Sequence, residues 1–312
     1  MQPFDYYRPQ TFEEAFGLLS TPDRRAVALA GGTDVIPLTR DQHLQPDLVV
    51  DVKALPGMRD LGLTSMEPCC GTGSGECLYV GAAVRMNELA RSDLVQGSWP
   101  LLADAAASMG NEQIRNRATI GGNICTASPA ADSAPALLVL EACVLIRGPE
   151  GDRSLPIGGF STGPKRHALR RGEIVAGLLI PKLPAGALSF HEKLSRRKAG
   201  DLSIVSVAVL ALPGDSAVNW RIALGAVAPT PVRAPEAEAV LAKGHDAEAV
   251  DLAAASAYGC SSPIADIRSG VEYRQAMIVN LTRRAIRAVV DRLPASANDP
   301  LPASANDPLP LA

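Results

Sequence analysis

Two Gly-Gly pairs are the residues of this sequence best suited to holding a phosphate group. Gly31-Gly32 stands inside ALAGGTDVIP and Gly121-Gly122 inside ATIGGN, each directly after an apolar segment typical of a strand. Glycine permits open backbone dihedrals and lets amide N–H groups approach phosphate oxygens. One such pair would favour an ordinary tight turn, but two can hold a diphosphate from both sides.

Polar side chains beside the pairs extend this hypothesis. Thr33, Thr119 and Asn123 can donate hydrogen bonds to phosphate or ribose, and Asp132 offers an acceptor for a ribose hydroxyl or the polar edge of a flavin. A G-x-G-x-x-G motif after a strand is absent, so a Rossmann site is not supported. The stretch GTGSG at 71–75 is followed by a strand pattern and is expected to be a hairpin tip.

The helix and strand patterns that must position these residues predict an α+β protein with three parts and a tail. Residues 1–57 alternate helix and strand patterns in a small βαβ-like unit, with TFEEAFGLLS and IPLTRDQ as helices and AVALA and DLVVDV as strands. Residues 58–178 combine the strand CLYVGAAV, a helix opening at 86–88, a helix around PLLADAAASMG and the apolar ALLVLEACVLIRG. Residues 179–293 predict a meander sheet covered by helices. Residues 294–312 repeat LPASANDP twice, which favours a flexible tail over a docking arm.

Composition and charge limit the classes of function to be considered. The chain has 312 residues, 47% of them hydrophobic, and a net charge of −3, which gives no electrostatic reason to expect nucleic acid or an anionic membrane as partner. A signal peptide or membrane-span pattern is not recognisable, which predicts a cytoplasmic protein. Six scattered cysteines fit a reducing compartment better than a disulfide scaffold, and most are expected to be plain thiols.

Three segments carry a family resemblance. AGGTD at 30–34, QIRNRATIGGNICTASPAAD at 113–132 and KLSRRKAGDLSIVSVA at 193–208 resemble, in order and spacing, the FAD-binding medium subunit of the xanthine dehydrogenase and carbon monoxide dehydrogenase family, the molybdenum hydroxylases. The resemblance covers roughly residues 1 to 290. It implies a bowl-shaped FAD-binding fold of two subdomains (PCMH type), followed by a small antiparallel sheet with helices.

The resemblance also implies which residues contact FAD. The third-domain lysine of the family matches Lys193, an apolar neighbour of the isoalloxazine ring matches Val175, and the segment from Lys193 to Asp201, with Arg196, would lie over the flavin. A run such as Arg196-Arg197-Lys198 is otherwise typical of a solvated charged face. The two glycine segments would hold the FAD pyrophosphate, and Asp132 would be the acidic residue that contacts the cofactor. The implied contact residues of these segments are Ala30, Gly31, Gly32, Thr33, Asp34, Thr119, Ile120, Gly121, Gly122, Asn123 and Asp132.

In such complexes the medium subunit is an electron relay. The resemblance implies partners: a large subunit with the molybdenum cofactor, a small subunit with two 2Fe-2S clusters, and a terminal electron acceptor. Cys69, Cys70 and Cys77 offer only three close thiolates, so a local 4Fe-4S cluster is not expected. The three cysteines favour a variable hairpin tip, with a redox-labile pair as the less favoured alternative.

Two other interpretations of the function stay open. A stand-alone FAD oxidase could use the same fold, although AGGTD contains no His or Cys to attach a flavin covalently. A non-catalytic scaffold could keep the fold, although both glycine pairs, Asp132 and Lys193 are intact.

Overall fold

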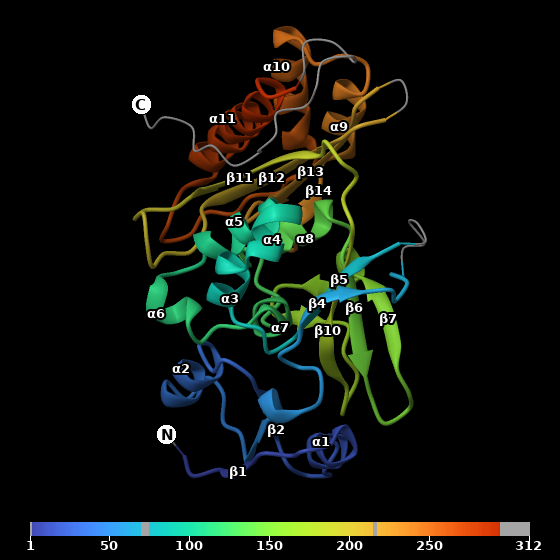
Figure 1. The fold of residues 1–312 in the computed structure, drawn as a ribbon. Coiled ribbons are helices and arrows are strands. Elements are labelled where there is room, and N and C mark those ends of the chain that lie inside the picture. The colour runs from blue at the N-terminus through green and yellow to red at the C-terminus, as the bar shows by residue number, and fades with distance from the viewer. Residues whose placement is uncertain (1, 70–74, 215–216, 294–312) are drawn as a thin grey trace.

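The computed structural model describes residues 2–69, 75–214 and 217–293, which form three units stacked from the N-terminal to the C-terminal part (Figure 1). The expected tail at 294–312 and most of the expected hairpin tip at 71–75 lie outside the described residues. The divisions at 57, 178 and 293 remain predictions; the strand that crosses position 178 continues to Pro181.

The first unit is a three-stranded parallel sheet in the order β1-β3-β2. The predicted helices and strands are confirmed, and the edge strand β1 is an addition that its exposed sequence DYY did not signal. Thr11 accepts a hydrogen bond from the Glu14 amide and so fixes where the first helix begins. The elements are β1 (Asp5–Tyr7), α1 (Phe12–Leu19), β2 (Ala26–Leu29), α2 (Val35–Arg40), β3 (Leu48–Asp51) and the short 3-10 turn η1 (Val52–Ala54).

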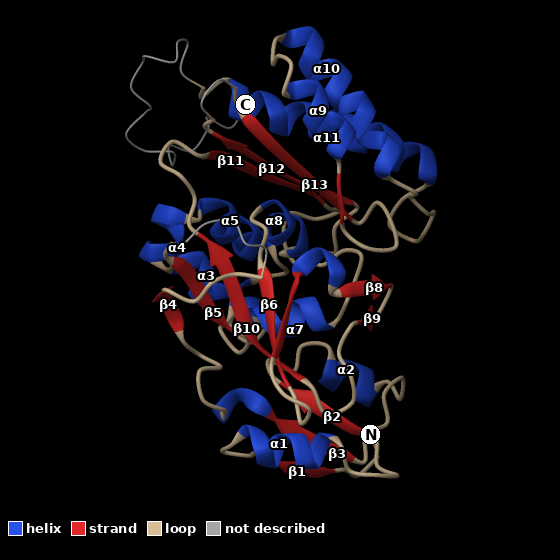
Figure 2. Cartoon of the chain, turned by 90° about the vertical axis from the view of Figure 1, so that its right-hand side faces the viewer, coloured by secondary structure: helices blue, strands red, loops and turns tan. Residues whose placement is uncertain are grey.

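The second unit is a five-stranded antiparallel sheet, β4-β5-β10-β6-β7, with short helices packed on one face (Figure 2). The apolar stretch ALLVLEACVLIRG is divided between a helix and a strand, α8 and β6. The elements are β4 (Leu61–Thr64), β5 (Cys77–Gly81), α3 (Met86–Arg91), α4 (Asp93–Ser98), α5 (Pro100–Ser108), α6 (Glu112–Arg115), α7 (Ile120–Cys125), α8 (Ala134–Val139), β6 (Cys143–Arg147), β7 (Arg153–Pro156), η2 (Ile157–Gly159), β8 (Ser161–Gly163), β9 (Arg166–His167) and β10 (Ile174–Pro181).

The third unit is the predicted antiparallel meander, β11-β12-β13-β14, between two layers of helices (Figures 1 and 2). Val207 and Val209 of β12 pack with the C-terminal helices, whereas Ala208 and Leu210 join the core of the second unit. Burial of both faces explains why β12 is a continuous apolar run rather than an alternating one. The elements are β11 (Leu188–Leu194), β12 (Val205–Leu212), β13 (Asn219–Gly225), β14 (Val232–Arg233), α9 (Pro235–Leu241), α10 (Ala247–Ser256), η3 (Ala257–Cys260) and α11 (Val271–Val290).

An aspartate with two arginines ties the loop before α11 to this sheet. Asp266 Oδ2 lies 2.6 Å from Arg268 Nη2 and 2.9 Å from Arg274 Nη2. Arg268 also donates to the carbonyl of Ser203, and the fully buried Arg274 to that of Ile204. Hydrogen bonds from Arg268 hold the pKa of Asp266 well below its usual value.

This network predicts a loss of stability in acid. Because the folded-state pKa of Asp266 is depressed, its contribution is present above the unfolded-state value of 3.8 and is lost as pH falls below it. Urea unfolding at pH 7 and pH 3 measures the free energy of unfolding. This free energy should fall less between the two pH values for Asp266→Asn than for the unsubstituted chain. Asp152→Asn, which removes an exposed ion pair with Arg147, is the control and should leave the slope unchanged. Equal slopes for Asp266→Asn and the parent chain would contradict this prediction.

Candidate functional site

The first glycine segment, Ala30–Asp34, joins β2 to α2 and leaves several amides unbonded. Gly32 has φ +78°, a left-handed conformation that favours glycine. Within residues 2–69, 75–214 and 217–293, no group accepts a hydrogen bond from the backbone amides of Gly31, Gly32 or Thr33. These neighbouring half-buried donors are available to an anionic ligand.

The two glycine segments meet through their backbones. A Cβ atom on Gly31 would lie 2.1 Å from the carbonyl oxygen of Arg117, just before the second segment. Thr126 Oγ1 donates to Asp34 Oδ2 at 2.9 Å and links the same two segments further along. The sequence-predicted residues around 31 and 121 are thus brought together, and glycine at 31 is what permits their approach.

The second pair differs from the prediction of a loop after a strand. Thr119 caps α7, its side chain accepting from the Gly122 amide at 3.1 Å, so both glycines lie in the first turn of a helix. The amides of Ile120 and Gly121 donate to the carbonyls of Val84 and Ala82 at 3.0 Å. These three amides are already bonded, so the second pair does not offer the free donors that the sequence suggested.

Close packing explains the second pair instead. A Cβ atom on Gly121 would lie 2.5 Å from the Cβ of Ala82, so only glycine lets α7 rest on the end of β5. The capping Thr119 and the buried Ile120 belong to the same contact. Asn123 is held by Ser133, whose hydroxyl donates to Asn123 Oδ1 at 2.6 Å.

Asp132 and Lys193 form a buried ion pair between the second and third units. Lys193 Nζ lies 2.9 Å from Asp132 Oδ1 and donates to the Ser108 carbonyl at 3.0 Å. Ser203 Oγ donates to the same carboxylate oxygen at 2.8 Å. Burial raises the pKa of Asp132, and the Lys193 charge opposes that rise. One oxygen of the carboxylate, Oδ1, is therefore already bonded by Lys193 and Ser203 of the chain itself.

The remaining predicted positions are placed differently. Val175 is buried in β10 within the main core. Arg196 and Arg197 are exposed, as in the charged-face reading, although Arg196 lies 3.4 Å from the carbonyl of Ile267 and Arg197 pairs with Asp201. Only Lys193 of this segment is buried beside the other site residues.

Sequence reasoning missed the residues that hold the site residues in place. Ser203, Ser133 and Thr126 each bond a predicted residue, and the Arg117 carbonyl contacts Gly31. Thr126 and Arg117 stand within the segment at 113–132, but Ser203 is reached only through the third unit. Small hydroxyl residues carry no distinctive pattern of their own.

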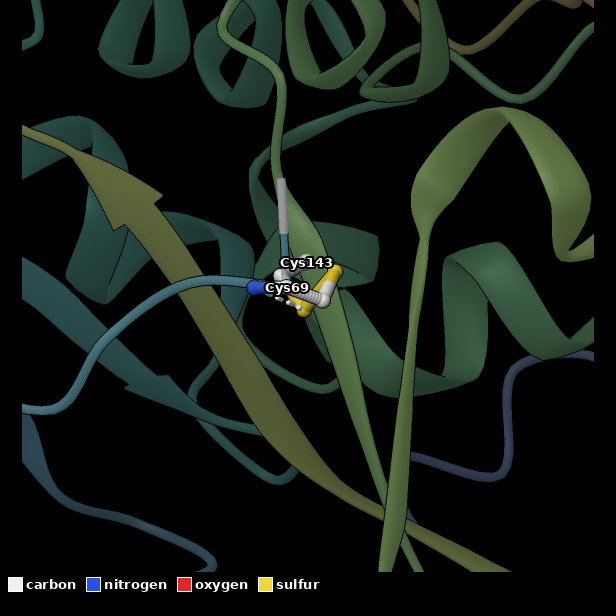
Figure 3. The surroundings of a disulfide bond; sticks show 2 residues. All are labelled: Cys69 and Cys143. Carbon is white, nitrogen blue, oxygen red and sulfur yellow. Dashed lines mark hydrogen bonds between the residues drawn. A yellow bond between two sulfur atoms is a disulfide. The ribbon is translucent and has the colours of Figure 1, made fainter. Parts of the chain in front are cut away.

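Three of the five cysteines that the structure describes are free thiols and two are paired. Cys69 and Cys143 form a disulfide, with their Cα atoms 5.8 Å apart (Figure 3). Cys77, Cys125 and Cys260 are free, and burial raises the pKa of Cys125 to about 12. The pairing joins residues 74 apart in sequence, so the tertiary fold rather than spacing determines it.

Comparisons with known proteins agree with this architecture. Residues 2–183 match the family described as the FAD binding domain in molybdopterin dehydrogenase, and residues 191–289 match the carbon monoxide dehydrogenase flavoprotein C-terminal domain. The chain is 32% identical over 287 residues to the carbon monoxide dehydrogenase medium chain of Hydrogenophaga pseudoflava, covering 91% of this chain and 96% of that one. It is 33% identical over 288 residues to the xanthine dehydrogenase FAD-binding subunit of Escherichia coli O157:H7, covering 91% and 95%.

Solved structures match over the same length. A structure of carbon monoxide dehydrogenase from Hydrogenophaga pseudoflava, which lacks the Mo-pyranopterin moiety of the molybdenum cofactor, superposes with a TM-score of 0.85 at 34% identity. The match covers 93% of this chain and 99% of that chain. The chain belongs to the family of FAD-binding medium subunits of molybdenum hydroxylases.

Proposed function

We propose that the chain binds FAD and serves as the electron-transfer subunit of a molybdenum hydroxylase complex. Electrons from 2Fe-2S clusters on a partner subunit pass through FAD to a terminal acceptor. The supporting relatives are oxidoreductase subunits, and their similarity extends over nearly the whole chain. Bound FAD would accept electrons singly or in pairs, which joins one-electron carriers to a two-electron acceptor.

The observation that carries the FAD proposal is the row of unbonded amides at Gly31, Gly32 and Thr33, packed against the segment before α7. Backbone N–H groups in an open glycine turn suit phosphate oxygens. The residues present therefore fit a diphosphate, with the first segment as its donor and α7 as the support behind it.

Other residues of the chain position the cofactor. Asp132 and Lys193 place one buried negative and one buried positive group beside each other, so either can turn to a polar flavin atom while the other keeps Ser203 or Ser108 as a partner. Val175 and the remaining predicted contacts, Ala30, Asp34, Thr119, Ile120, Gly121, Gly122 and Asn123, are proposed as the lining or the support of that site.

Substrate oxidation is assigned to another subunit. The similar medium chains include those of carbon monoxide dehydrogenase, of glyceraldehyde dehydrogenase from Sulfolobus acidocaldarius and of nicotine 6-hydroxylase from Paenarthrobacter nicotinovorans, whose named substrates differ widely in structure. Similar chains serving unlike substrates favour a large subunit with the molybdenum cofactor as the place of substrate selection. A small 2Fe-2S subunit and a terminal acceptor complete the proposed partners.

A comparison of the isolated chain with its complex tests the relay. The isolated chain should bind FAD yet oxidise no aldehyde, purine or aromatic substrate, since the hydroxylation site is proposed to lie on a partner. Visible spectra would record flavin binding and flavin reduction by substrate, which should occur only after the partner subunits are added. Substrate oxidation by the chain alone would favour a stand-alone oxidase, and absence of flavin would favour a scaffold.

We also propose a cytoplasmic location. In the described part of the chain, no helix is both long enough and apolar enough to cross a membrane. The support for the cytoplasm is the composition and the resemblance, and fractionation of cells with an antibody against the chain would test it.

A further inference from the structure

The residues between β4 and the undescribed positions 70–74 lie over the outer face of the five-stranded sheet. Residues 65–68 belong to no helix or strand; 65–67 are exposed and Pro68 is buried. The Met66 amide donates to Thr64 Oγ1 at 3.3 Å, and the Cys69 amide to Cys143 Sγ at 3.2 Å. The Cys69–Cys143 disulfide is the covalent attachment of the segment to the sheet (Figure 3).

The surface beneath this segment is apolar and separate from the main core. Because side chains alternate along a strand, Val144 and Ile146 enter the main core while Cys143 and Leu145 point to the other face. There Cys77, Tyr79, Cys143, Leu145 and Leu179 form a small cluster of their own.

A cavity of about 730 Å³ lies beside this cluster. Leu63, Met66 and Glu67 line it together with Tyr79 and Leu179 of the sheet. Residues of the segment next to the disulfide are therefore also lining residues of the cavity.

The two residues of the pair differ in their exposure to solvent. Cys69 is an exposed residue, whereas Cys143 is fully buried. We therefore assign the attack of a thiolate from solution to the sulfur of Cys69, and the exchange then releases Cys143. The neighbouring Cys77 is not suited to this attack, because burial raises the pKa of its thiol and keeps it protonated.

We propose that Cys69 and Cys143 are a redox-active cysteine pair that fastens and releases residues 65–69. A dithiol reductant attacks Cys69, forms a mixed disulfide and expels the Cys143 thiolate, which takes up a proton. The second thiol of the reductant then displaces Cys69, so the reductant leaves as a disulfide and both cysteines become thiols. Hydrogen peroxide reverses the change: it oxidises exposed Cys69 to a sulfenic acid with loss of water, and Cys143 attacks that sulfur with loss of a second water.

The consequence is local. Reduction frees 65–69 and uncovers the cluster around Leu179, while the glycine segments, Asp132 and Lys193 keep contacts that do not involve either cysteine. The inference is thus independent of FAD binding and of the proposed relay.

Hydrogen exchange and thiol labelling of the full-length chain test the pair. Among the cysteines that the structure describes, alkylation of the oxidised chain under denaturing conditions should label Cys77, Cys125 and Cys260 but neither Cys69 nor Cys143; after dithiothreitol both should be labelled, and peroxide should restore their protection. Fragment-ion mass spectra separate a label at Cys69 from one at the neighbouring Cys70. Exchange at the Cys69 amide should rise at least about tenfold on reduction, because its hydrogen bond to Cys143 Sγ is lost with the attachment.

Two variants sharpen the test. Cys69→Ser should exchange at position 69 without reductant as fast as the reduced parent chain, and Cys260→Ser, a matched change at a distant free thiol, should behave as the parent chain does. The reduction experiment on the parent chain stands even if Cys69→Ser folds poorly. Labelling of Cys69 in the peroxide-treated chain, or unchanged exchange at the Cys69 amide after complete reduction, would overturn the proposal.

Discussion

Gly31→Ala is expected to abolish FAD binding while the chain still folds. The added Cβ would lie 2.1 Å from the Arg117 carbonyl oxygen and 2.8 Å from its carbon, and both belong to backbone that cannot rotate away. The segment that carries the free amides must therefore move away from the segment before α7. Because phosphate donors act only at hydrogen-bond distance, occupancy should fall by at least about tenfold.

The measurement separates binding from folding. Flavin absorbance per chain gives occupancy after reconstitution with FAD, and thermal unfolding of the apo chain gives stability. Gly17→Ala is the matched control, since nothing lies within 4 Å of its added Cβ and both occupancy and stability should be kept. Full flavin occupancy in a folded Gly31→Ala chain would move the diphosphate away from the first glycine segment.

The alternation of helix and strand in the first unit could be predicted from sequence because local signals agree there. Apolar runs, the capping Thr11 and the glycines after β2 all predict the same boundaries. The apolar run at 205–212 likewise predicted a strand of the meander sheet from local sequence. Only the structure shows that the two faces of this strand enter different cores.

The glycine pairs show what a local sequence pattern cannot predict. Both read alike as GG after apolar residues, yet Gly31 and Gly32 open a turn with free amides, whereas Gly121 and Gly122 begin a helix whose amides bond residues 82, 84 and 119. The difference depends on Ala82 and Val84, which lie about forty residues earlier in the chain, as the printed sequence shows. A pattern confined to a few neighbours cannot report such a contact.

The same limit applies to the Cys69–Cys143 pair and to Ser203. Each joins residues about seventy positions apart, with 74 between the cysteines and 71 between Ser203 and Asp132. Six cysteines permit many pairings, so spacing alone selects none. A resemblance can transfer Asp132 and Lys193 as site residues, but it does not say that they bind each other in the chain alone.

Lys193→Met is expected to destabilise the folded chain by about 3–5 kcal/mol at pH 7, because it leaves Asp132 as a buried carboxylate with Ser203 as its donor. The loss should depend on pH. Burial already raises the pKa of Asp132 above 3.8, and removing the ammonium raises it further. A raised folded-state pKa gives stability that is present below the unfolded-state value and is lost as pH rises. The deficit of the variant should therefore be small near pH 4 and largest at neutral pH.

Urea unfolding of four chains measures this: the parent, Lys193→Met, Asp132→Asn and the double variant. The double variant should recover most of the lost stability, since no buried charge remains unpaired. Lys182→Met, which breaks an exposed pair with Glu76, should cost at most about 1 kcal/mol. A pH-independent deficit, or a double variant as unstable as the sum of the single ones, would mean that the two charges are not coupled.

FAD titration of the stable double variant then isolates their role in binding: we expect weaker binding at unchanged stability, because both polar groups proposed to meet the flavin have been replaced.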